Sequence, residues 1–237
     1  MDAVLSNIQC IVTCEHAVNT IPERYQHLFH QEPNVLNTHQ AIDFGALSIA
    51  KHFSRVLNCP LFEANASRLL IECNRSLHHR ALFSEWTKGL SDAEKESLIT
   101  EYYQPFRDAV ESDIQSKVKQ GIQVLHLSIH SFTPVFHDIT RNTDIGFLYD
   151  PTRYGEKSLA TQWRRQLSKE RAPFHVRMNY PYRGTTDGFA SALRKQYTEK
   201  EYLGFEIESN QALTQNAATL ESLSHHLTMS FSHLLNR

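Results

Sequence analysis

Short apolar segments rich in β-branched residues alternate along this chain with longer segments whose apolar residues recur at helical spacing. The apolar segments lie at 8–14, 124–129 and 203–207, and the helical ones at 46–57, 155–169 and 213–234. A strand buried on both faces reads as such an apolar run, and helices must cover it. The alternation therefore predicts an α/β fold, a three-layer α/β/α sandwich of the phosphorylase/hydrolase-like type with a mostly parallel central sheet.

Weaker signals fill in the rest of this pattern. Further extended segments are expected at 60–64, 68–73, 145–149 and 174–178. Ser91 and Glu94 have the spacing of a capping box, which predicts the start of a helical region. We expect Pro105 to interrupt that region and Gly121 to end it.

Size and composition favour one compact unit. A chain of 237 residues with 41% hydrophobic content can bury one substantial core. Glycine and proline, eight of each, are scattered and not gathered into a linker, so we expect residues 1–237 to form a single domain. Four cysteines without a CxxC pair are too sparse for a disulfide framework, which predicts reduced and mostly buried thiols.

Charge and hydropathy exclude two classes of partner. The formal net charge of −2 and a pI near 6.7 provide no broad basic field for a phosphate backbone, so we expect no nucleic acid partner. The first twenty residues lack the pattern of a signal peptide, and no apolar run approaches the ~18 residues of a membrane span. These absences predict a cytoplasmic protein with no membrane partner.

Polar residues that carry chemistry stand at the ends of the expected strands or within the last one. They are His16, Asn74, Arg75, His130, Glu206 and Glu208. In α/β sheets, ligands bind in the crevice outside the carboxyl ends of the strands. Together these side chains would supply metal ligands, a cation for a carboxylate and a general base.

His16 and His130 are the candidate metal ligands. Zinc prefers imidazole nitrogens combined with a carboxylate, and a catalytic site keeps one position for water. His126 shares a strand face with His130, but it lies four strand residues away, roughly 13 Å. His126 and His130 therefore cannot bind the same ion.

Several short motifs occur in one order over most of the chain. They are Cys14-Glu15-His16-Ala17, Asp43-Phe44-Gly45-Ala46, Ser67-Arg68-Leu69, Glu72-Cys73-Asn74-Arg75, His130-Ser131-Phe132, Asn179 with Pro181-Tyr182, and Glu206-Ile207-Glu208. This ordered series, from about residue 10 to residue 211, resembles the N-formylglutamate amidohydrolase family. That family is in turn similar to zinc carboxypeptidases and aspartoacylases.

The resemblance implies a role for each matched residue. His16 and His130 would bind Zn²⁺, or another divalent ion, and Asn74 with Arg75 would hold a substrate carboxylate. Glu206 would activate water, while Glu208 shares its strand face and remains an alternative. The implied reaction is hydrolysis of the amide bond of a small acidic N-acyl amino acid, with N-formyl-L-glutamate giving formate and L-glutamate.

The third metal ligand departs from the carboxypeptidase pattern. Those enzymes have a Glu three residues after the first His, where this chain has Asn19. We expect Asp43 to take that role, with a plain helix N-cap as its ordinary alternative. Glu15 is adjacent to His16 and would point away if the strand continued.

Arg68, Tyr182 and Arg183 complete the candidate substrate-binding residues, although an ion pair or a Pro-containing turn would also explain them. Two other functions stay open: a carboxypeptidase-like deacylase or peptidase, and a catalytically silent metal- or ligand-binding protein. A nucleophilic hydrolase is not favoured, because the chain has no GxSxG motif and Ser131 would face away from its neighbour His130. Acyl group, native metal and oligomeric state are left open by the sequence.

Overall fold

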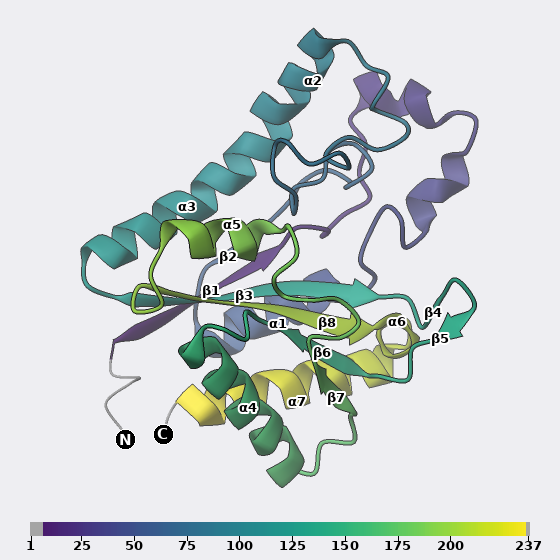
Figure 1. The fold of residues 1–237 in the computed structure, drawn as a ribbon. Helices are drawn as coiled ribbons and strands as arrows, with labels where there is room; N and C mark the ends of the chain where they lie inside the picture. Colours follow the sequence, from purple (N-terminus) through teal and green to yellow (C-terminus); the bar gives the residue numbers. More distant parts are fainter. Residues whose placement is uncertain (1–6, 236–237) are drawn as a thin grey trace.

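A six-stranded sheet forms the centre of the computed structural model, which describes residues 7–235 (Figure 1). Its strands are β1 (Ile8–Cys14), β2 (Leu61–Glu63), β3 (Gln123–Phe132), β6 (Ile145–Leu148), β7 (Val176–Met178) and β8 (Tyr202–Asn210), in the order β2-β1-β3-β8-β6-β7. The four strands β2, β1, β3 and β8 are parallel, whereas β6 is antiparallel to β8 and parallel to β7. The expected α/β fold with a mostly parallel sheet is confirmed.

Helices cover both faces of this sheet (Figure 1). One face carries α1 (Ala46–Leu57), α4 (Tyr154–Lys169) and α7 (Ala217–Leu235). The opposite face carries α3 (Gln104–Lys119) and α5 (Phe189–Gln196), with α2 (Asp92–Leu98) extending from α3 through the π-helical turn η3 (Ile99–Tyr103). The short elements are η1 (Glu23–Phe29), η2 (Pro33–Asn37), β4 (Val135–Phe136), β5 (Ile139–Thr140) and α6 (Gln211–Thr214).

Two separate hydrophobic clusters hold these layers together. On the side of α1, α4 and α7, the rings of Phe53, Trp163 and Phe231 pack against one another beneath the sheet. On the side of α3 and α5, buried Ile114 and Phe189 belong to the second cluster. Strands β1, β3, β6 and β8 are therefore buried along most of their length, whereas the edge strands β2 and β7 are partly exposed.

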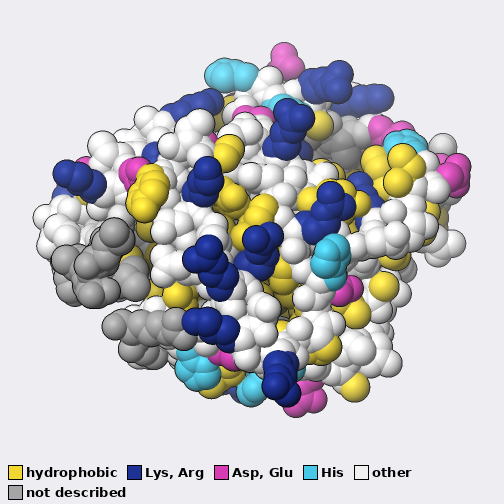
Figure 2. Space-filling model, turned by 60° about the horizontal axis from the view of Figure 1, so that its bottom comes forward, with side chains coloured by type: hydrophobic (Ala, Val, Ile, Leu, Met, Phe, Trp, Pro, Cys, Tyr) yellow, Lys and Arg dark blue, Asp and Glu magenta, His cyan; other side chains and the backbone are white. Residues whose placement is uncertain are grey.

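The outward faces of the helices are polar. Lys157, Arg164, Arg165 and Lys169 are exposed on α4, and Figure 2 shows Lys and Arg side chains spread among uncharged and apolar ones on this side of the molecule. Within residues 7–235, every helix is too short or too polar to cross a membrane.

The strand expected at 68–73 is absent, and that prediction is wrong. The segment forms turns instead: Ser67 Oγ accepts a hydrogen bond from Leu69 N, and the backbone N–H of Leu70 bonds to Ser67 O. The N–H of Glu72 bonds to Leu82 O in a neighbouring loop. Apolar residues are buried here without a strand partner, so hydrophobicity alone misled the assignment.

The helical region after Ser91 and the helix α5 also differ from expectation. The capping box of Ser91 and Glu94 is present, but Pro105 does not interrupt the helical region, because it lies in the first turn of α3, where its missing N–H is not needed. Strand β3 ends in His130, Ser131 and Phe132, as the sequence indicates. Helix α5 was not anticipated from the sequence.

Candidate metal centre and active site

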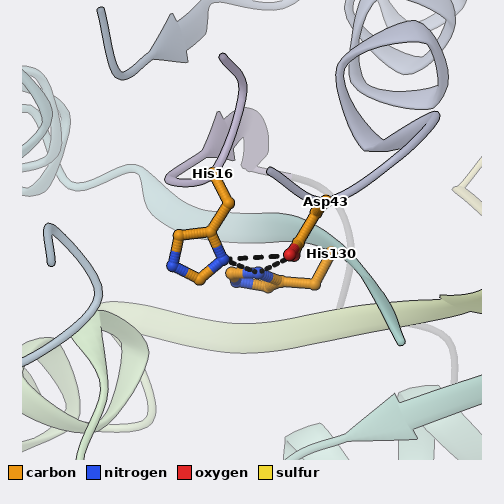
Figure 3. Close-up of side chains that lie close together, drawn as sticks. All are labelled: His16, Asp43 and His130. Atoms are coloured by element: carbon orange, nitrogen blue, oxygen red, sulfur yellow. Dashed lines mark hydrogen bonds and ion pairs between the residues drawn. The ribbon is translucent and has the colours of Figure 1, made fainter. Parts of the chain in front are cut away.

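Three side chains from separate segments meet at the carboxyl ends of β1 and β3 (Figure 3). His16 follows β1, His130 lies near the end of β3, and Asp43 lies in the loop before α1. The backbone N–H of Asp43 donates to His16 O at 3.2 Å, which ties this loop to the end of β1. The parallel pairing of β1 with β3 brings the two histidines to the same edge of the sheet.

The facing atoms of this group form a compact triangle. His16 Nδ1 lies 3.1 Å from Asp43 Oδ2, His130 Nδ1 lies 3.0 Å from the same oxygen, and the two Nδ1 atoms are 3.1 Å apart. All three side chains are buried. The His-Asp-His group can hold a metal ion.

Asp43 does not cap α1, so the ordinary alternative for this residue is wrong. The N-cap position is taken by Gly45 at φ +80°, where an added Cβ would lie 2.5 Å from Thr214 Cβ. The carboxylate of Asp43 turns instead toward the histidines and accepts a hydrogen bond from Ser131 N at 3.2 Å. This position allows Asp43 to act as a ligand together with His16 and His130.

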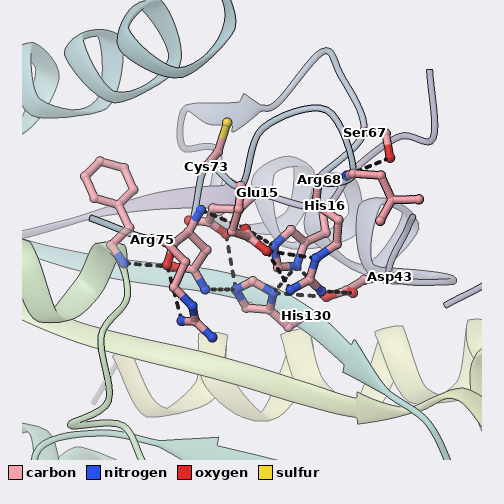
Figure 4. A network of polar contacts seen from close by, with 12 residues as sticks. Glu15, His16, Asp43, Ser67, Arg68, Cys73, Arg75 and His130 are labelled. Atoms are coloured by element: carbon pink, nitrogen blue, oxygen red, sulfur yellow. Dashed lines mark hydrogen bonds and ion pairs between the residues drawn. The ribbon is translucent and has the colours of Figure 1, made fainter. Parts of the chain in front are cut away.

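Carboxylates surround the two histidines on their other sides (Figure 4). Glu72 Oε1 lies 2.6 Å from His16 Nε2, and Glu15 Oε2 lies 3.3 Å from His130 Nε2. Arg68 contacts Glu72 at 2.6 Å and Asp43 at 3.5 Å. With neutral histidines, three carboxylates face one guanidinium, and the group requires about two more positive charges.

The pKa shifts follow from this excess of negative charge. Burial disfavours a charged ring at His130, but hydrogen bonds with Asp43 and Glu15 outweigh it and hold its pKa well above the ordinary value. Burial likewise disfavours the Glu15 anion, yet contact with His130 lowers the pKa of Glu15 to about 2. The pKa of Glu72 is also lowered, because Arg68 and His16 overcome the effect of burial. The centre therefore attracts cations.

Two alternatives for the third ligand are not supported by this geometry. Glu15 does not point away, because β1 ends at Cys14 and the chain turns, but its carboxylate meets the Nε2 side of His130 and not the Nδ1 side. Asn19 donates to Leu36 O at 2.8 Å and takes no part in the His-Asp-His group. His126, as expected, also lies outside this group, bonded to Thr13 and Tyr202.

Glu206 and Glu208 project from β8 into the same pocket as the triangle. In the sheet, Glu206 pairs with Ser128 and Glu208 with His130. Glu208 Oε2 is buried and has no hydrogen-bond partner among the residues that the structure describes. Burial raises the pKa of Glu208 to about 7, and burial also raises the pKa of Glu206.

The arginines of the pocket differ in whether an acidic side chain already neutralises them. Arg68 is committed to Glu72 and Asp43. Arg75 donates to the backbone carbonyls of Asn74 and Asp187 and has no acidic partner within residues 7–235. Its guanidinium therefore retains donors for an anionic ligand.

Asn74 has a largely structural position. Its Oδ1 accepts a hydrogen bond from Phe189 N at 2.7 Å, which fixes the start of α5, and its Nδ2 lies 3.4 Å from His130 Nε2. The side chain thus links the metal centre to α5.

The segment between β7 and α5 forms one wall of the pocket. Asn179 Oδ1 accepts hydrogen bonds from Tyr149 N and Gly184 N, both at 3.1 Å, and so closes this loop. Tyr182 accepts a bond from Arg141 at 3.3 Å, while the side chain of Arg183 has no hydrogen bond or ion pair in the described part of the chain.

All ten sequence-predicted site residues line one cavity of about 300 Å³. Its walls are His16, Asp43, Arg68, Asn74, Arg75, His130, Ser131, Tyr182, Arg183, Thr186, Glu206 and Glu208. A cavity of about 370 Å³ lies at the opposite end of β1, but its described lining contains no histidine, acid, lysine or arginine. The chemistry of the first cavity, not the size of the second, identifies the candidate active site.

Sequence reasoning did not assign functions to Glu72 or Thr186. Glu72 belongs to the motif Glu72-Cys73-Asn74-Arg75. An acidic residue within the otherwise apolar run from Leu69 to Cys73 could have indicated a function for it. Thr186 carried no signal beyond its closeness to the aromatic loop.

Comparison with family models places this geometry in a known context. The model of the N-formylglutamate amidohydrolase family matches residues 8–214. The chain belongs to this family. N-formylglutamate amidohydrolases are, by their name, enzymes that hydrolyse amides, and a small-molecule substrate follows for the chain.

Two solved structures resemble the chain over nearly its whole length. A gene product of Agrobacterium tumefaciens is 29% identical, with a TM-score of 0.82, covering 98% of this chain and 92% of that one. The N-formylglutamate amidohydrolase of Ralstonia eutropha JMP134 is 18% identical, with a TM-score of 0.68, covering 96% and 92%; this second likeness concerns the fold. The search of curated proteins gave no match.

Proposed function

We propose that the chain is a zinc-dependent amidohydrolase that converts N-formyl-L-glutamate and water into formate and L-glutamate. The observation that carries this proposal is the meeting, in one cavity of about 300 Å³, of the His-Asp-His triangle, two buried glutamates and two arginines that have no acidic partner within residues 7–235. Family membership supplies the reaction class.

The donor set fits zinc. Two imidazole nitrogens and one carboxylate oxygen, with a position left for water, are typical of catalytic zinc sites. A tetrahedral ion with bonds of about 2.0 Å spaces its ligand atoms about 3.3 Å apart, close to the 3.0–3.1 Å separations of the triangle. When bound by His16, Asp43 and His130, zinc supplies Lewis acidity and lowers the pKa of a bound water.

Glu206 is proposed as the group that takes the proton from the attacking water and delivers it to the departing amine nitrogen. Its carboxylate faces the pocket, and its raised pKa moves it toward the range of an effective general base. Glu208 lies two residues further along the same strand face and is the alternative for this role.

Arg75 and Arg183 are proposed to bind the two carboxylates of the substrate. A guanidinium matches the planar carboxylate with paired donors, and neither arginine is neutralised by an acidic side chain within residues 7–235. Tyr182 would cover the substrate from the same loop as Arg183. Arg68 would act indirectly, by holding Glu72 and Asp43 in place, because it already forms ion pairs with both.

The proposal is tested by measuring formate release from N-formyl-L-glutamate, before and after removal of metal by a chelator and after addition of zinc. We expect activity that is lost on chelation, restored by zinc, and absent from the His130→Ala variant. Arg165→Ala, an exposed change on α4, serves as the matched control with full activity. Activity that persists in the fully chelated protein would contradict zinc dependence.

The two remaining functions correspond to other outcomes of this assay. A deacylase or peptidase would bind zinc but release product only from a different acyl amino acid or a peptide; the small cavity disfavours a polypeptide substrate. A silent binding protein would bind zinc and hydrolyse no member of an N-acyl amino acid panel.

A further inference from the structure

The hydrogen bonds behind the two histidines have a fixed direction. An ionised carboxylate can only accept hydrogen bonds, whereas each imidazole nitrogen is either a donor or an acceptor. His16 Nδ1 and His130 Nδ1 face Asp43 Oδ2 at 3.1 and 3.0 Å, so without an ion each could donate to this oxygen. A metal ion held between these three atoms would need the Nδ1 lone pairs, and the contacts on the Nε2 side then decide where each ring carries its hydrogen.

The position of the ring hydrogen is easiest to assign at His16. Glu72 Oε1 lies 2.6 Å from His16 Nε2 and also accepts Asn74 N at 3.0 Å. Its other oxygen accepts from Arg68 Nε at 2.8 Å. Because this carboxylate can only accept, His16 Nε2 must donate its hydrogen to it. A neutral His16 ring that holds a metal ion then has its lone pair on Nδ1.

At His130 the hydrogen is also assigned to Nε2, here from the hydrogen bonds of the Ser128 hydroxyl. Ser128 Oγ donates to Glu15 Oε2 at 2.8 Å, and it lies 2.9 Å from His130 Nε2. Since Ser128 has one hydrogen and gives it to Glu15, its oxygen can only accept from His130 Nε2. The ring thereby donates on its Nε2 side, toward Ser128 and toward Glu15 Oε2 at 3.3 Å. The longer 3.4 Å approach of Asn74 Nδ2 to the same nitrogen then joins two donors and is not a hydrogen bond.

The second oxygen of Glu15 is fixed as well. Thr13 Oγ1 donates to Glu15 Oε1 at 2.6 Å and lies 2.8 Å from His126 Nε2. His126 Nδ1 lies 2.7 Å from the hydroxyl of Tyr202. These buried contacts hold Glu15 in place from the side away from the pocket.

We infer that Glu15 and Glu72 are positioning residues that fix His130 and His16 as Nε2–H tautomers and turn both Nδ1 lone pairs toward the metal position. This inference rests on the metal site of the proposed function and not on its substrate. Outer carboxylates of this kind orient the ring and raise its basicity as a ligand.

The two carboxylates differ in the strength of their effect. Glu72 contacts its histidine directly at 2.6 Å and is itself held by Arg68. Glu15 acts at 3.3 Å and through Ser128. We therefore expect Glu72 to contribute more to metal affinity than Glu15.

The test is the zinc dissociation constant, measured by competition with a chromogenic chelator in the absence of substrate. We expect Glu72→Gln to weaken zinc binding about 10- to 100-fold and Glu15→Gln to weaken it by a smaller factor. Glu96→Gln, an exposed change of the same chemistry on α2, is the control and leaves the constant unchanged. Unaltered zinc binding in folded Glu72→Gln and Glu15→Gln proteins would overturn the inference.

A measurement on the wild-type protein covers the case in which a variant does not fold. Nitrogen-15 spectra of the zinc-loaded protein with labelled histidine should show a hydrogen on Nε2 of both His16 and His130. A hydrogen on Nδ1 of either ring would overturn the inference. Neither readout involves N-formylglutamate, so failure of the proposed substrate would leave both results interpretable.

Discussion

At His126, burial acts on a single ring far from the metal position. It lowers the pKa of His126 from 6.5 to about 4, while the unfolded chain keeps a value near ~6.5. Between these values the unfolded state binds a proton that the folded state does not, so stability falls as the pH drops from 6.5 toward 4. Above pH 6.5 the contribution is fully present.

The expected contribution of His126 is on the order of 3 kcal/mol. Urea unfolding of the chelated protein at pH 4.5 to 7 measures it, with His126→Gln as the comparison. The variant should be less stable at pH 7, because it loses contacts with Thr13 and Tyr202, but its stability should depend less on pH. Parallel pH profiles for the two proteins would contradict the assignment.

The two pocket glutamates are separated by a paired substitution. We expect Glu206→Gln to lower kcat by about 10²- to 10⁴-fold, because the proton acceptor is lost, with zinc still bound. Glu208→Gln should lower kcat by less than that. Steady-state kinetics together with the zinc content of each protein provide the check, and a larger loss in Glu208→Gln would transfer the role of base to Glu208.

The arginine assignment predicts a change in substrate preference. Loss of a charged hydrogen bond costs about 1.5–3 kcal/mol, so Arg75→Ala and Arg183→Ala should each reduce kcat/KM for N-formyl-L-glutamate by roughly 10- to 150-fold. One of the two should lose little toward N-formyl-L-glutamine, which lacks the side-chain carboxylate. If both variants lose the same factor on both substrates, neither arginine reads that carboxylate.

The sequence predicted the position of His16 and His130 at the edge of the sheet better than it predicted the residues around them. His16 and His130 could be identified because each stands at or near the end of an apolar strand, where α/β proteins place their chemistry. The choice between ligand and helix cap for Asp43 could not be made, since it depends on a loop that brings together residues 27 positions apart. Glu15 would point away only if the strand continued, and that condition is not met because β1 ends at Cys14.

At the scale of elements, the loop that carries Tyr182 and Arg183 packs its backbone against a glycine in β6. An added Cβ at Gly146 in β6 would lie 1.9 Å from Tyr180 O. The backbone of the loop lies so close to β6 at this point that only a glycine fits between them.

Gly146→Ala should therefore displace the loop. We expect KM for the substrate to rise by at least about tenfold and stability to fall by on the order of 1–3 kcal/mol, with zinc affinity unchanged. Gly121→Ala is the control: its Cβ has open space at φ +74°, so it should cost about 1 kcal/mol without affecting KM. An unchanged KM in Gly146→Ala would show that the loop position does not govern substrate binding.

Elements with a strong periodic pattern were predicted closely, whereas the segment 68–73 was not. β1 was predicted with its observed bounds, and α4 to within one residue at its start. The apolar residues Leu69, Leu70 and Ile71 are buried as expected, but in turns whose hydrogen bonds run to Ser67 and Leu82. A short apolar run predicts burial, and only the neighbouring chain decides whether it pairs as a strand.

At the scale of the whole molecule, the metal position joins distant parts of the chain. His16, Asp43 and His130 are separated in sequence by 27, 87 and 114 positions, and three carboxylates concentrate negative charge around them. If this position holds an ion, its removal would leave the charge balanced, within residues 7–235, by Arg68 and by protons on the rings. Metal loss should therefore destabilise the entire fold and not the loops alone.

Thermal unfolding measures this coupling. A ligand that binds only the folded state at about 1,000 times its dissociation constant stabilises by about 4 kcal/mol, which raises Tm by roughly 10 °C for a chain of this size. We expect zinc to raise Tm of the chelated wild-type protein by this amount and to leave Tm of His130→Ala almost unchanged. Because that variant keeps the buried carboxylates but lacks one ligand, an equal rise in both proteins would place the zinc elsewhere, whereas a rise confined to the wild type ties the stability of the fold to the His-Asp-His triangle.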